Sequence, residues 1–365
     1  MKKVLIVLYN LSQTSGVAKC IMPYYDSLIN NGYKIDFLLL SNNLGSYVDI
    51  IQDESSIKIL PQDCSKYSLK TRRYISGLMQ SEHYSIVHVN IPGPFGVMVL
   101  SIAKKYGAFP IYHSHNPKSK ESFKAYLSTL ICDPLCTNIA ELRLACSQET
   151  GISTFGKRNF TKLRNCIDVS RFSFDFSARS EIRNELCINE DTLLIGTVGR
   201  IEKQKNPIFT LQCINELRRI RQDFHYVWIG RGSMLEEVHR YLTDNNMEKY
   251  VSFVGPRTDV YKWYSAMDCF LLPSNYEGLG IVFIEAQAAG LTCFGSSNVS
   301  VETEITELMN RLDLKLGSSK WAEIISNINT HYDRSAYNKQ VVMSGYNIAN
   351  EKEALLNLYN GILKL

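Results

Sequence analysis

The sequence predicts an α/β protein built from two Rossmann-like, doubly wound domains. Three observations support this prediction. The chain has 365 residues, more than one typical domain contains. Short apolar runs alternate with longer amphipathic stretches, which is typical of parallel strands joined by crossover helices. The alternation then starts again near the middle of the chain.

The elements of the first half follow in order from the N-terminus. Strands are predicted at 4–8, 35–40, 86–89 and 110–113, and helices at 17–30, 69–80 and 96–105. The opening apolar run, 4–8, is short and is followed by Asn10, so it fits a buried strand better than a signal peptide. No run of about 18 apolar residues occurs, so no segment is expected to span a membrane.

The second half repeats the pattern. Strands are predicted at 193–198, 224–229, 251–254 and 269–272, and helices at 207–219, 234–245, 259–267 and 281–289. The domain boundary is expected after Phe172, because 173–180 is polar and has little periodicity. The last segment, 351–365, carries apolar residues at helical spacing.

Composition and charge restrict the class of protein. The hydrophobic fraction of 45% and the charged fraction of 21% are ordinary for a globular protein, and a net charge of +4 is too mild for a nucleic-acid binder. Residues 1–170 hold 19 Lys and Arg against 12 Asp and Glu, a balance of +7, and the remainder hold 21 against 24, a balance of −3. A basic first half suits an anionic membrane surface or a phosphate-bearing acceptor, although scattered solvated lysines explain it equally well.

The cysteines indicate reduced thiols in a cytoplasmic protein. There are ten, and no Cys-x-x-Cys pair occurs among them. Cys132 and Cys136 lack partners at the spacing of a zinc site, so no metal site is predicted.

The segment 269–290 carries the most chemical information. An apolar run ends at Pro273-Ser274, and a glycine-rich loop then opens a helix. Glu277 stands at the mouth of this loop and Glu285 about two turns along, with seven residues between them. Backbone N–H groups at such a helix N-terminus favour an anion, for example a diphosphate. Two glutamates on a solvated helix are the alternative explanation.

Two cations follow the strand at 193–198. Arg200 and Lys205 lie in the loop after Gly199, and an arginine with a lysine can neutralise a departing diphosphate without a metal ion. Two exposed cations in a loop are the alternative explanation.

These motifs resemble those of retaining, nucleotide-sugar-dependent glycosyltransferases of family 4, which have the GT-B fold. The resemblance rests on Pro-Ser-x-Tyr-Glu-Gly-Leu-Gly from Pro273, on Glu-x7-Glu, and on Gly-Arg-x4-Lys-Asn from Gly199. It implies catalytic roles for Glu277, Arg200 and Lys205. It implies donor binding by the following residues: Gly278, Leu279, Gly280, Ile281 and Glu285.

Weaker matches extend the implied site. Gly230, Gly255 and Arg257 correspond to loops around the nucleotide, and Gly16 to a donor-binding loop of the first domain. Related enzymes carry Gly-Gly and then an acidic residue there, whereas this chain has Ser15-Gly16 and then Lys19. Family members also place a histidine at the strand end where His113 stands, which implies a catalytic role for His113, with His115 and Asn116 as acceptor-binding candidates.

The resemblance implies transfer of a sugar, with retained configuration, from a nucleotide-diphosphate sugar to an acceptor hydroxyl. A UDP-sugar is the expected donor and cosubstrate, and no cofactor or metal is expected because no Asp-x-Asp motif occurs. The narrower likeness is to bacterial capsular and exopolysaccharide enzymes, which implies a lipid-linked or oligosaccharide acceptor. The implied domains are 1–172 for the acceptor, 173–345 for the nucleotide sugar, and a helix in 346–365 that crosses back to the first.

Several alternatives stay open. A UDP-sugar 2-epimerase shares the GT-B fold, and a non-catalytic partner subunit would keep the fold without the reaction. A dehydrogenase is disfavoured because no Gly-x-Gly-x-x-Gly follows an early strand. The stretch 117–131, with Lys118, Lys120 and Lys124, either rests on the inner face of the cell membrane or is an ordinary amphipathic helix.

Overall fold

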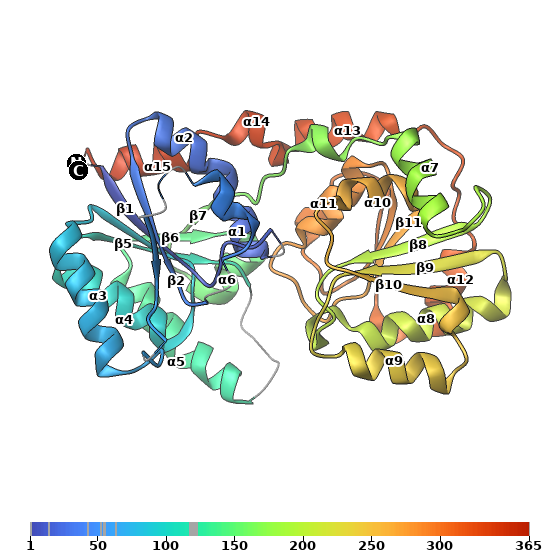
Figure 1. The fold of residues 1–365 in the computed structure, drawn as a ribbon, viewed down its shortest axis with the longest axis horizontal. Coiled ribbons are helices and arrows are strands. Elements are labelled where there is room, and N and C mark those ends of the chain that lie inside the picture. The colour runs from blue at the N-terminus through green and yellow to red at the C-terminus, as the bar shows by residue number, and fades with distance from the viewer. Residues whose placement is uncertain are drawn as a thin grey trace. The chain divides into compact units, whose positions relative to one another are not determined.

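The protein divides into two compact units. The structure, a computed structural model, describes residues 2–13, 15–41, 44–51, 53, 56–62, 64–116 and 123–364, with only the backbone for 123–126. Unit 1 comprises Met1–Cys166 and Ile348–Leu365, and unit 2 comprises Ile167–Asn347 (Figure 1). The chain therefore changes units before Phe172, where the sequence had suggested the boundary, and its last segment belongs to unit 1.

Unit 1 is built on a parallel sheet. Among its described residues the strand order is β3-β2-β1-β4-β5-β6-β7. The strands are β1 Lys3–Leu8, β2 Lys34–Leu39, β3 Ile57–Ile59, β4 Ile86–Val89, β5 Phe109–Ser114, β6 Leu142–Ala145 and β7 Thr161–Lys162. The order reverses between β1 and β4, and open parallel sheets bind ligands at the carboxyl ends of the strands that flank such a reversal.

Helices cover both faces of this sheet, and a separate hydrophobic core lies on each face. They are α1 Gly16–Ile21, α2 Tyr25–Asn30, α3 Leu69–Glu82, α4 Gly93–Lys105, α5 Phe123–Ile139, α6 Gln148–Phe155, α14 Ile348–Glu351 and α15 Ala354–Ile362. The predicted continuous helix at 17–30 is wrong, because a 3-10 turn at Met22–Tyr24 separates α1 from α2. Pro23 lies in that turn and cannot donate the backbone hydrogen bond that a continuous helix needs.

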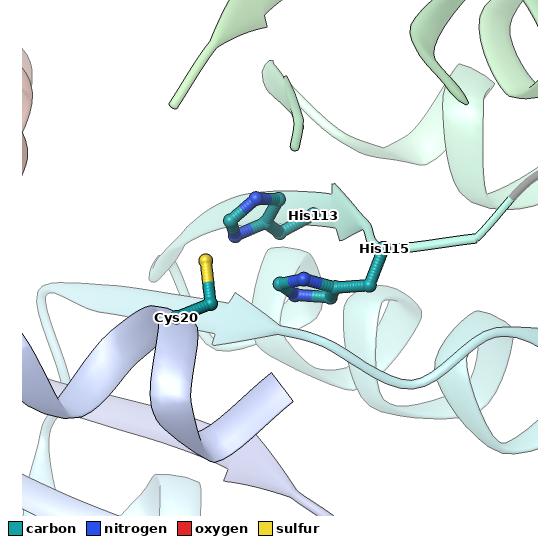
Figure 2. Close-up of side chains that lie close together, drawn as sticks. All are labelled: Cys20, His113 and His115. Atoms are coloured by element: carbon teal, nitrogen blue, oxygen red, sulfur yellow. The ribbon is translucent and has the colours of Figure 1, made fainter. Parts of the chain in front are cut away.

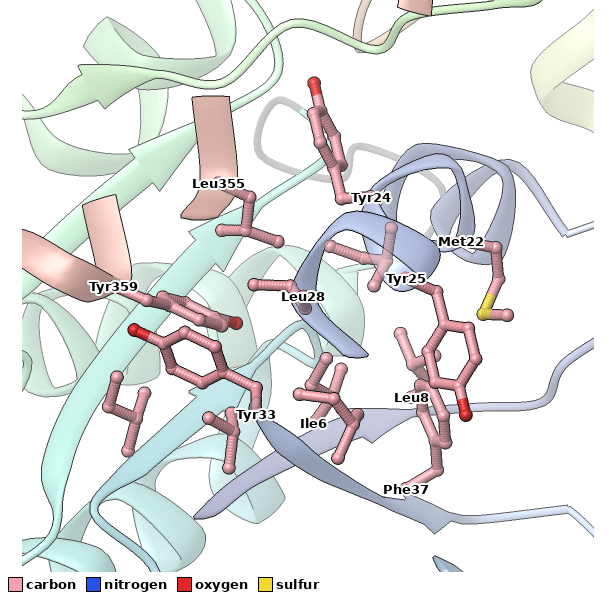
Figure 3. Close-up of a cluster of buried hydrophobic side chains, with 14 of the residues drawn as sticks. Ile6, Leu8, Met22, Tyr24, Tyr25, Leu28, Tyr33, Phe37, Leu355 and Tyr359 are labelled. Carbon is pink, nitrogen blue, oxygen red and sulfur yellow. The ribbon is translucent and has the colours of Figure 1, made fainter. Parts of the chain in front are cut away.

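The C-terminal helix α15 completes the core on one face of unit 1. Leu355, Leu356 and Tyr359 are buried in the same cluster as Leu28 and Tyr33. Figure 3 shows Tyr33 and Tyr359 side by side, and their ring centroids lie 5.7 Å apart. Residues from the two ends of the chain therefore share one core.

Unit 2 repeats the doubly wound plan, with strand order β10-β9-β8-β11-β12-β13 in its sheet. The strands are β8 Leu193–Val198, β9 Phe224–Ile229, β10 Val251–Gly255, β11 Cys269–Leu272, β12 Thr292–Ser296 and β13 Met309–Leu312. Helices α8, α9 and α12 lie on one face, and α7, α10, α11 and α13 on the other (Figure 1). Their bounds are α7 Phe176–Glu185, α8 Pro207–Ile220, α9 Leu235–Asp244, α10 Val260–Ala266, α11 Ile281–Ala288, α12 Gly317–Ser326 and α13 Ser335–Val341.

The two doubly wound parallel sheets confirm the predicted α/β class. The polar stretch 173–180, however, is not irregular. Asp175 caps the start of α7 by accepting hydrogen bonds from the backbone of Ser177 and Ala178, which explains why a polar segment begins a helix. Within the described part of the chain, no helix is both long and apolar enough to cross a membrane.

Candidate active site

The donor-site candidates of unit 2 gather at the carboxyl ends of β8 and β11, where the strand order of the sheet reverses. The loop after β8 and the loop after β11 hold each other in place. The backbone N–H of Asn275 donates to the carbonyl of Gln204 at 2.8 Å, and the Asn275 amide donates to the carbonyl of Lys203 at 2.6 Å. The Gln204 amide in turn donates to the carbonyl of Tyr276 at 3.2 Å.

These two loops bring Lys205 and Glu277 into contact. Nζ of Lys205 lies 2.6 Å from Oε1 of Glu277, and the two side chains are only 13% and 6% exposed. The Ser274 hydroxyl donates to the same carboxylate oxygen at 2.6 Å. Among the described residues no hydrogen bond reaches the other oxygen, Oε2. The lysine and the carboxylate therefore form a fixed unit with one acceptor atom left for a ligand.

Arg200 lies in the same loop as Lys205 and is held loosely. Its side chain is exposed, and its contact with Oε1 of Gln204 is long, at 3.5 Å. A guanidinium held this weakly can turn to a phosphate at little energetic cost, because it gives up no strong partner.

The N-terminus of α11 follows directly after the loop that carries Glu277. Gly280 caps the helix with a φ of 86°, a left-handed conformation that disfavours any side chain. Gly278 and Leu279 are buried before it, and Ile281 begins the helix. The N–H groups of a first helical turn lack intrahelical partners and attract anions, so this turn suits a phosphate.

Glu285 lies inside the protein rather than at the surface. It is 1% exposed, and Oε2 accepts a hydrogen bond from the Tyr264 hydroxyl at 2.9 Å. Burial, and then the nearby Glu285 carboxylate, hold the pKa of Tyr264 well above its usual value, so the phenol stays protonated and keeps donating.

Two further glycines shape the neighbouring strand ends. A Cβ on Gly230 would lie 2.0 Å from the carbonyl oxygen of Gly199, so only glycine lets these two loops approach. The Gly230 N–H donates to the carbonyl of Gly255 at 2.9 Å. Packing therefore explains glycine at 230 independently of any ligand. A Cβ on Gly255 would meet nothing within 4 Å, and there the left-handed φ of 71° is what favours glycine.

Arg257 already has protein partners. It forms a two-pronged ion pair with Asp259, with both N···O distances at 2.9 Å, and its guanidinium lies 5.2 Å from the ring centroid of Trp263. The hydrogen bond to Asp259 raises the pKa of Arg257. A donor-binding role would require this arginine to act alongside these contacts.

In unit 1, His113 is the last but one residue of β5 and belongs to a chain of buried polar side chains. Nδ1 of His113 lies 3.2 Å from Nε2 of His88, and Nδ1 of His88 lies 2.7 Å from the hydroxyl of Tyr359 on α15. Burial lowers the pKa of His88 to about 3 and that of His113 well below its usual value, so both rings are neutral near pH 7.

His115 and Asn116 follow directly. Nε2 of His115 donates to Oδ1 of Asn90 at 2.8 Å, and burial lowers the pKa of His115 to about 3. Asn116 is exposed. Sequence reasoning missed Asn90, His88 and Tyr359. Asn90 and His88 lie at the end of β4, the strand beside β5, so their position in the sequence could have indicated them. The contact of Tyr359 with His88 depends on the tertiary fold and leaves no signal in the sequence.

Gly16 begins α1 in open surroundings, because a Cβ built on it meets nothing within 4 Å. The fold itself therefore does not require glycine there. The lysines proposed to meet a membrane, Lys118, Lys120 and Lys124, lie outside the residues whose side chains are described.

Comparison with known proteins identifies the proteins that this chain resembles. Residues 178–313, which include the loops of Lys205 and Glu277, match the family described as Glycosyl transferases group 1. The chain is 28% identical to the putative glycosyltransferase EpsF of Bacillus subtilis, over 98% of this chain and 96% of that protein. It is 23% identical to an Escherichia coli protein named UDP-Gal:alpha-D-GlcNAc-diphosphoundecaprenol alpha-1,3-galactosyltransferase, over 94% and 93% of the two chains.

A solved structure shares the fold. HepE of Anabaena, crystallised with UDP and glucose, superposes with a TM-score of 0.80 at 17% identity, over 99% of this chain and all of that one. The fold is therefore GT-B. Together these findings support a glycosyltransferase similar to those of family 4 that uses a nucleotide sugar.

Proposed function

We propose that this glycosyltransferase is retaining and metal-independent, and that it moves a sugar from a UDP-sugar to a lipid-linked acceptor in capsular or exopolysaccharide synthesis. The observation that carries the proposal is the buried ion pair of Lys205 and Glu277 beside the N-terminus of α11. It combines a fixed cation, a carboxylate with an open oxygen, and a helix terminus suited to phosphate.

Charge neutralisation is the chemical task of this cluster. When the bond between the sugar and the diphosphate breaks, negative charge grows on the leaving phosphate. Lys205 and the first turn of α11 supply positive charge there from fixed positions, and Arg200 turns to the phosphate at little cost, so the three stabilise the transition state more than the ground state. The acceptor oxygen forms a bond to the anomeric carbon of the sugar, from which the diphosphate departs. The proton of the acceptor hydroxyl passes to the departing diphosphate.

Glu277 has two tasks in this proposal. Through Oε1 it fixes the position of the Lys205 ammonium, and through Oε2 it accepts a hydrogen bond from a hydroxyl of the donor sugar. Glu285, which accepts a hydrogen bond from the Tyr264 hydroxyl, binds the ribose of the nucleotide. His113, neutral and at the carboxyl edge of unit 1, orients a sugar hydroxyl through Nε2.

The similar proteins support the choice of donor and acceptor. The name of the Escherichia coli relative specifies UDP-galactose and a diphosphoundecaprenol-linked sugar, and HepE was crystallised with UDP. The net charge of +7 over residues 1–170 would also favour a polyprenyl-diphosphate acceptor, because its diphosphate is negatively charged.

The decisive test is a transfer assay. The purified protein is given a panel of UDP-, GDP- and ADP-sugars with polyprenyl-diphosphate-linked acceptors, and the product linkage is determined by NMR. We expect transfer from a UDP-sugar with the anomeric configuration kept, and loss of transfer in Glu277→Ala. An inverted product would overturn the retaining mechanism. Conversion of the UDP-sugar to an isomer without an acceptor would instead identify a 2-epimerase.

Membrane attachment has its own test. About 1 kcal/mol per basic residue near an anionic surface makes Lys118, Lys120 and Lys124 sufficient for weak attachment. The protein should sediment with anionic vesicles at low salt, release at high salt, and stay in solution when the three lysines are replaced by Glu. UDP binding should be the same in that variant. If the wild-type protein ignores such vesicles at low salt, a water-soluble acceptor becomes the better hypothesis.

A further inference from the structure

Unit 1 gathers three side chains that are common metal ligands. Cys20 comes from α1, His113 is the last but one residue of β5, and His115 follows that strand. One potential ligand atom from each lies within 4.8 Å of the others. Figure 2 shows the sulfur of Cys20 pointing toward the two imidazole rings. Cys20 and His113 are fully buried, and His115 is partly buried.

Two ring nitrogens in this cluster have no hydrogen-bond partner among the described residues. They are Nε2 of His113 and Nδ1 of His115, and both are buried. Buried polar atoms without partners are rare because each costs free energy, so such atoms point to a ligand.

The surrounding contacts prepare these nitrogens to bind a cation. Nε2 of His115 donates to Asn90, so the lone pair of that ring lies on Nδ1. When Nδ1 of His113 donates to His88, and His88 donates to the Tyr359 hydroxyl, the lone pair of His113 lies on Nε2. Outer partners of this kind fix the tautomer and raise the basicity of metal-binding histidines.

The Cys20 thiol completes the set. It donates to Oδ1 of Asn165, and on metal binding that proton leaves to solvent as the thiolate forms. The Asn165 amide can then turn its NH₂ group toward the sulfur. One thiolate and two imidazoles, with a fourth position open, match the ligand preferences of Zn²⁺.

We propose that Cys20, His113 and His115 form a Zn²⁺-binding site with a fourth position open to water. This goes beyond the proposed transfer reaction, which needs no metal. The site lies at the carboxyl edge of the unit 1 sheet, and a bound cation occupies the Nε2 atom with which His113 would orient a sugar. Zn²⁺ is therefore an inhibitor of the enzyme rather than a cofactor.

Binding is tested with Co²⁺ and Zn²⁺ on the full-length, reduced, metal-free protein. We expect one Co²⁺ per chain and thiolate-to-cobalt charge-transfer absorption in the near ultraviolet, which one equivalent of Zn²⁺ abolishes. Cys20→Ser should remove this absorption and weaken Zn²⁺ binding at least about 100-fold, since loss of even an outer-shell partner costs 10–100-fold. Cys187→Ser, which removes an exposed thiol of unit 2, is the matched control and should bind as the wild type does.

Two results would overturn the proposal. One is the absence of a saturable one-to-one cobalt signal in the wild-type protein. The other is a Cys20→Ser protein that keeps the charge-transfer band. If Cys20→Ser does not fold, His115→Gln serves instead, with the thiolate band kept and the affinity lowered. These readouts do not require transferase activity, so a failure of the proposed sugar transfer would not be confused with a failure of the metal site.

Discussion

The ion pair between Lys205 and Glu277 gives the sharpest test of the donor site. Because the side chains are only 13% and 6% exposed, removing either one leaves a charge that water hydrates poorly. Breaking a buried pair in this way costs about 3–5 kcal/mol, and the remaining exposure of Lys205 favours the lower end. At about 3 kcal/mol, a domain of this size should melt about 6–12 °C lower.

A double-mutant cycle separates this pair from its surroundings. Lys205→Ala and Glu277→Ala should each melt earlier, and the double variant should lose about 1–3 kcal/mol less than the sum, because it leaves no unpaired charge. In the transfer assay each single variant should lower kcat/KM at least about 100-fold, roughly 2.7 kcal/mol. The double variant should be no slower than the singles, since the two residues act as one unit.

The matched control is Lys203→Ala, which removes an exposed lysine from the same loop. Differential scanning calorimetry and initial-rate kinetics give the two readouts. If Lys205→Ala melts and turns over as the Lys203→Ala control does, the ion pair contributes neither stability nor catalysis, and the diphosphate role of Lys205 is wrong.

Three further predictions follow from the unit 1 and unit 2 geometry. Arg200→Ala should weaken UDP binding about 10- to 100-fold in calorimetric titration, because a charged hydrogen bond contributes about 1.5–3 kcal/mol, whereas Arg219→Ala on the exposed side of α8 should have no effect. Gly230→Ala should destabilise the protein by about 1–3 kcal/mol, because its Cβ would overlap the Gly199 carbonyl, while Gly16→Ala should leave the melting temperature unchanged. Equal melting temperatures for these two variants would contradict the packing argument. Finally, transfer should survive EDTA, or increase if Zn²⁺ was bound, and a loss of activity restored by Mn²⁺ would contradict a metal-independent reaction.

The fold was largely predictable because its signals are local. Buried strands such as 193–198 and 269–272 are continuous apolar runs, and the structure confirms both. The prediction failed at 17–30, where Pro23 interrupts a helix whose apolar spacing continues across it, and at 173–180, where the cap at Asp175 outweighs weak periodicity.

The sequence indicated individual residues of the candidate site but not the contacts between them. Motifs singled out Lys205 and Glu277, yet their contact joins residues 72 positions apart and depends on how two loops pack. Cys20 drew no attention as a ligand, because it lies on α1, whereas His113 and His115 lie at the end of β5, more than 90 positions along the chain. Roles assigned from the resemblance, such as that of Glu285 toward ribose, stay predictions.

The membership of 348–365 in unit 1 has a consequence for biosynthesis. A ribosome releases the residues of unit 2 while the first unit still lacks Leu355, Leu356 and Tyr359 from one face of its core. Until those side chains are synthesised, the part of the core around Leu28 and Tyr33 lacks the cover that α15 provides, and this apolar surface can bind chaperones or aggregate. The second unit, which is continuous in sequence, can finish folding first. A nonsense mutation that removes residues 348–365 would thus damage unit 1, at the N-terminal end of the chain, more than unit 2, which directly precedes those residues.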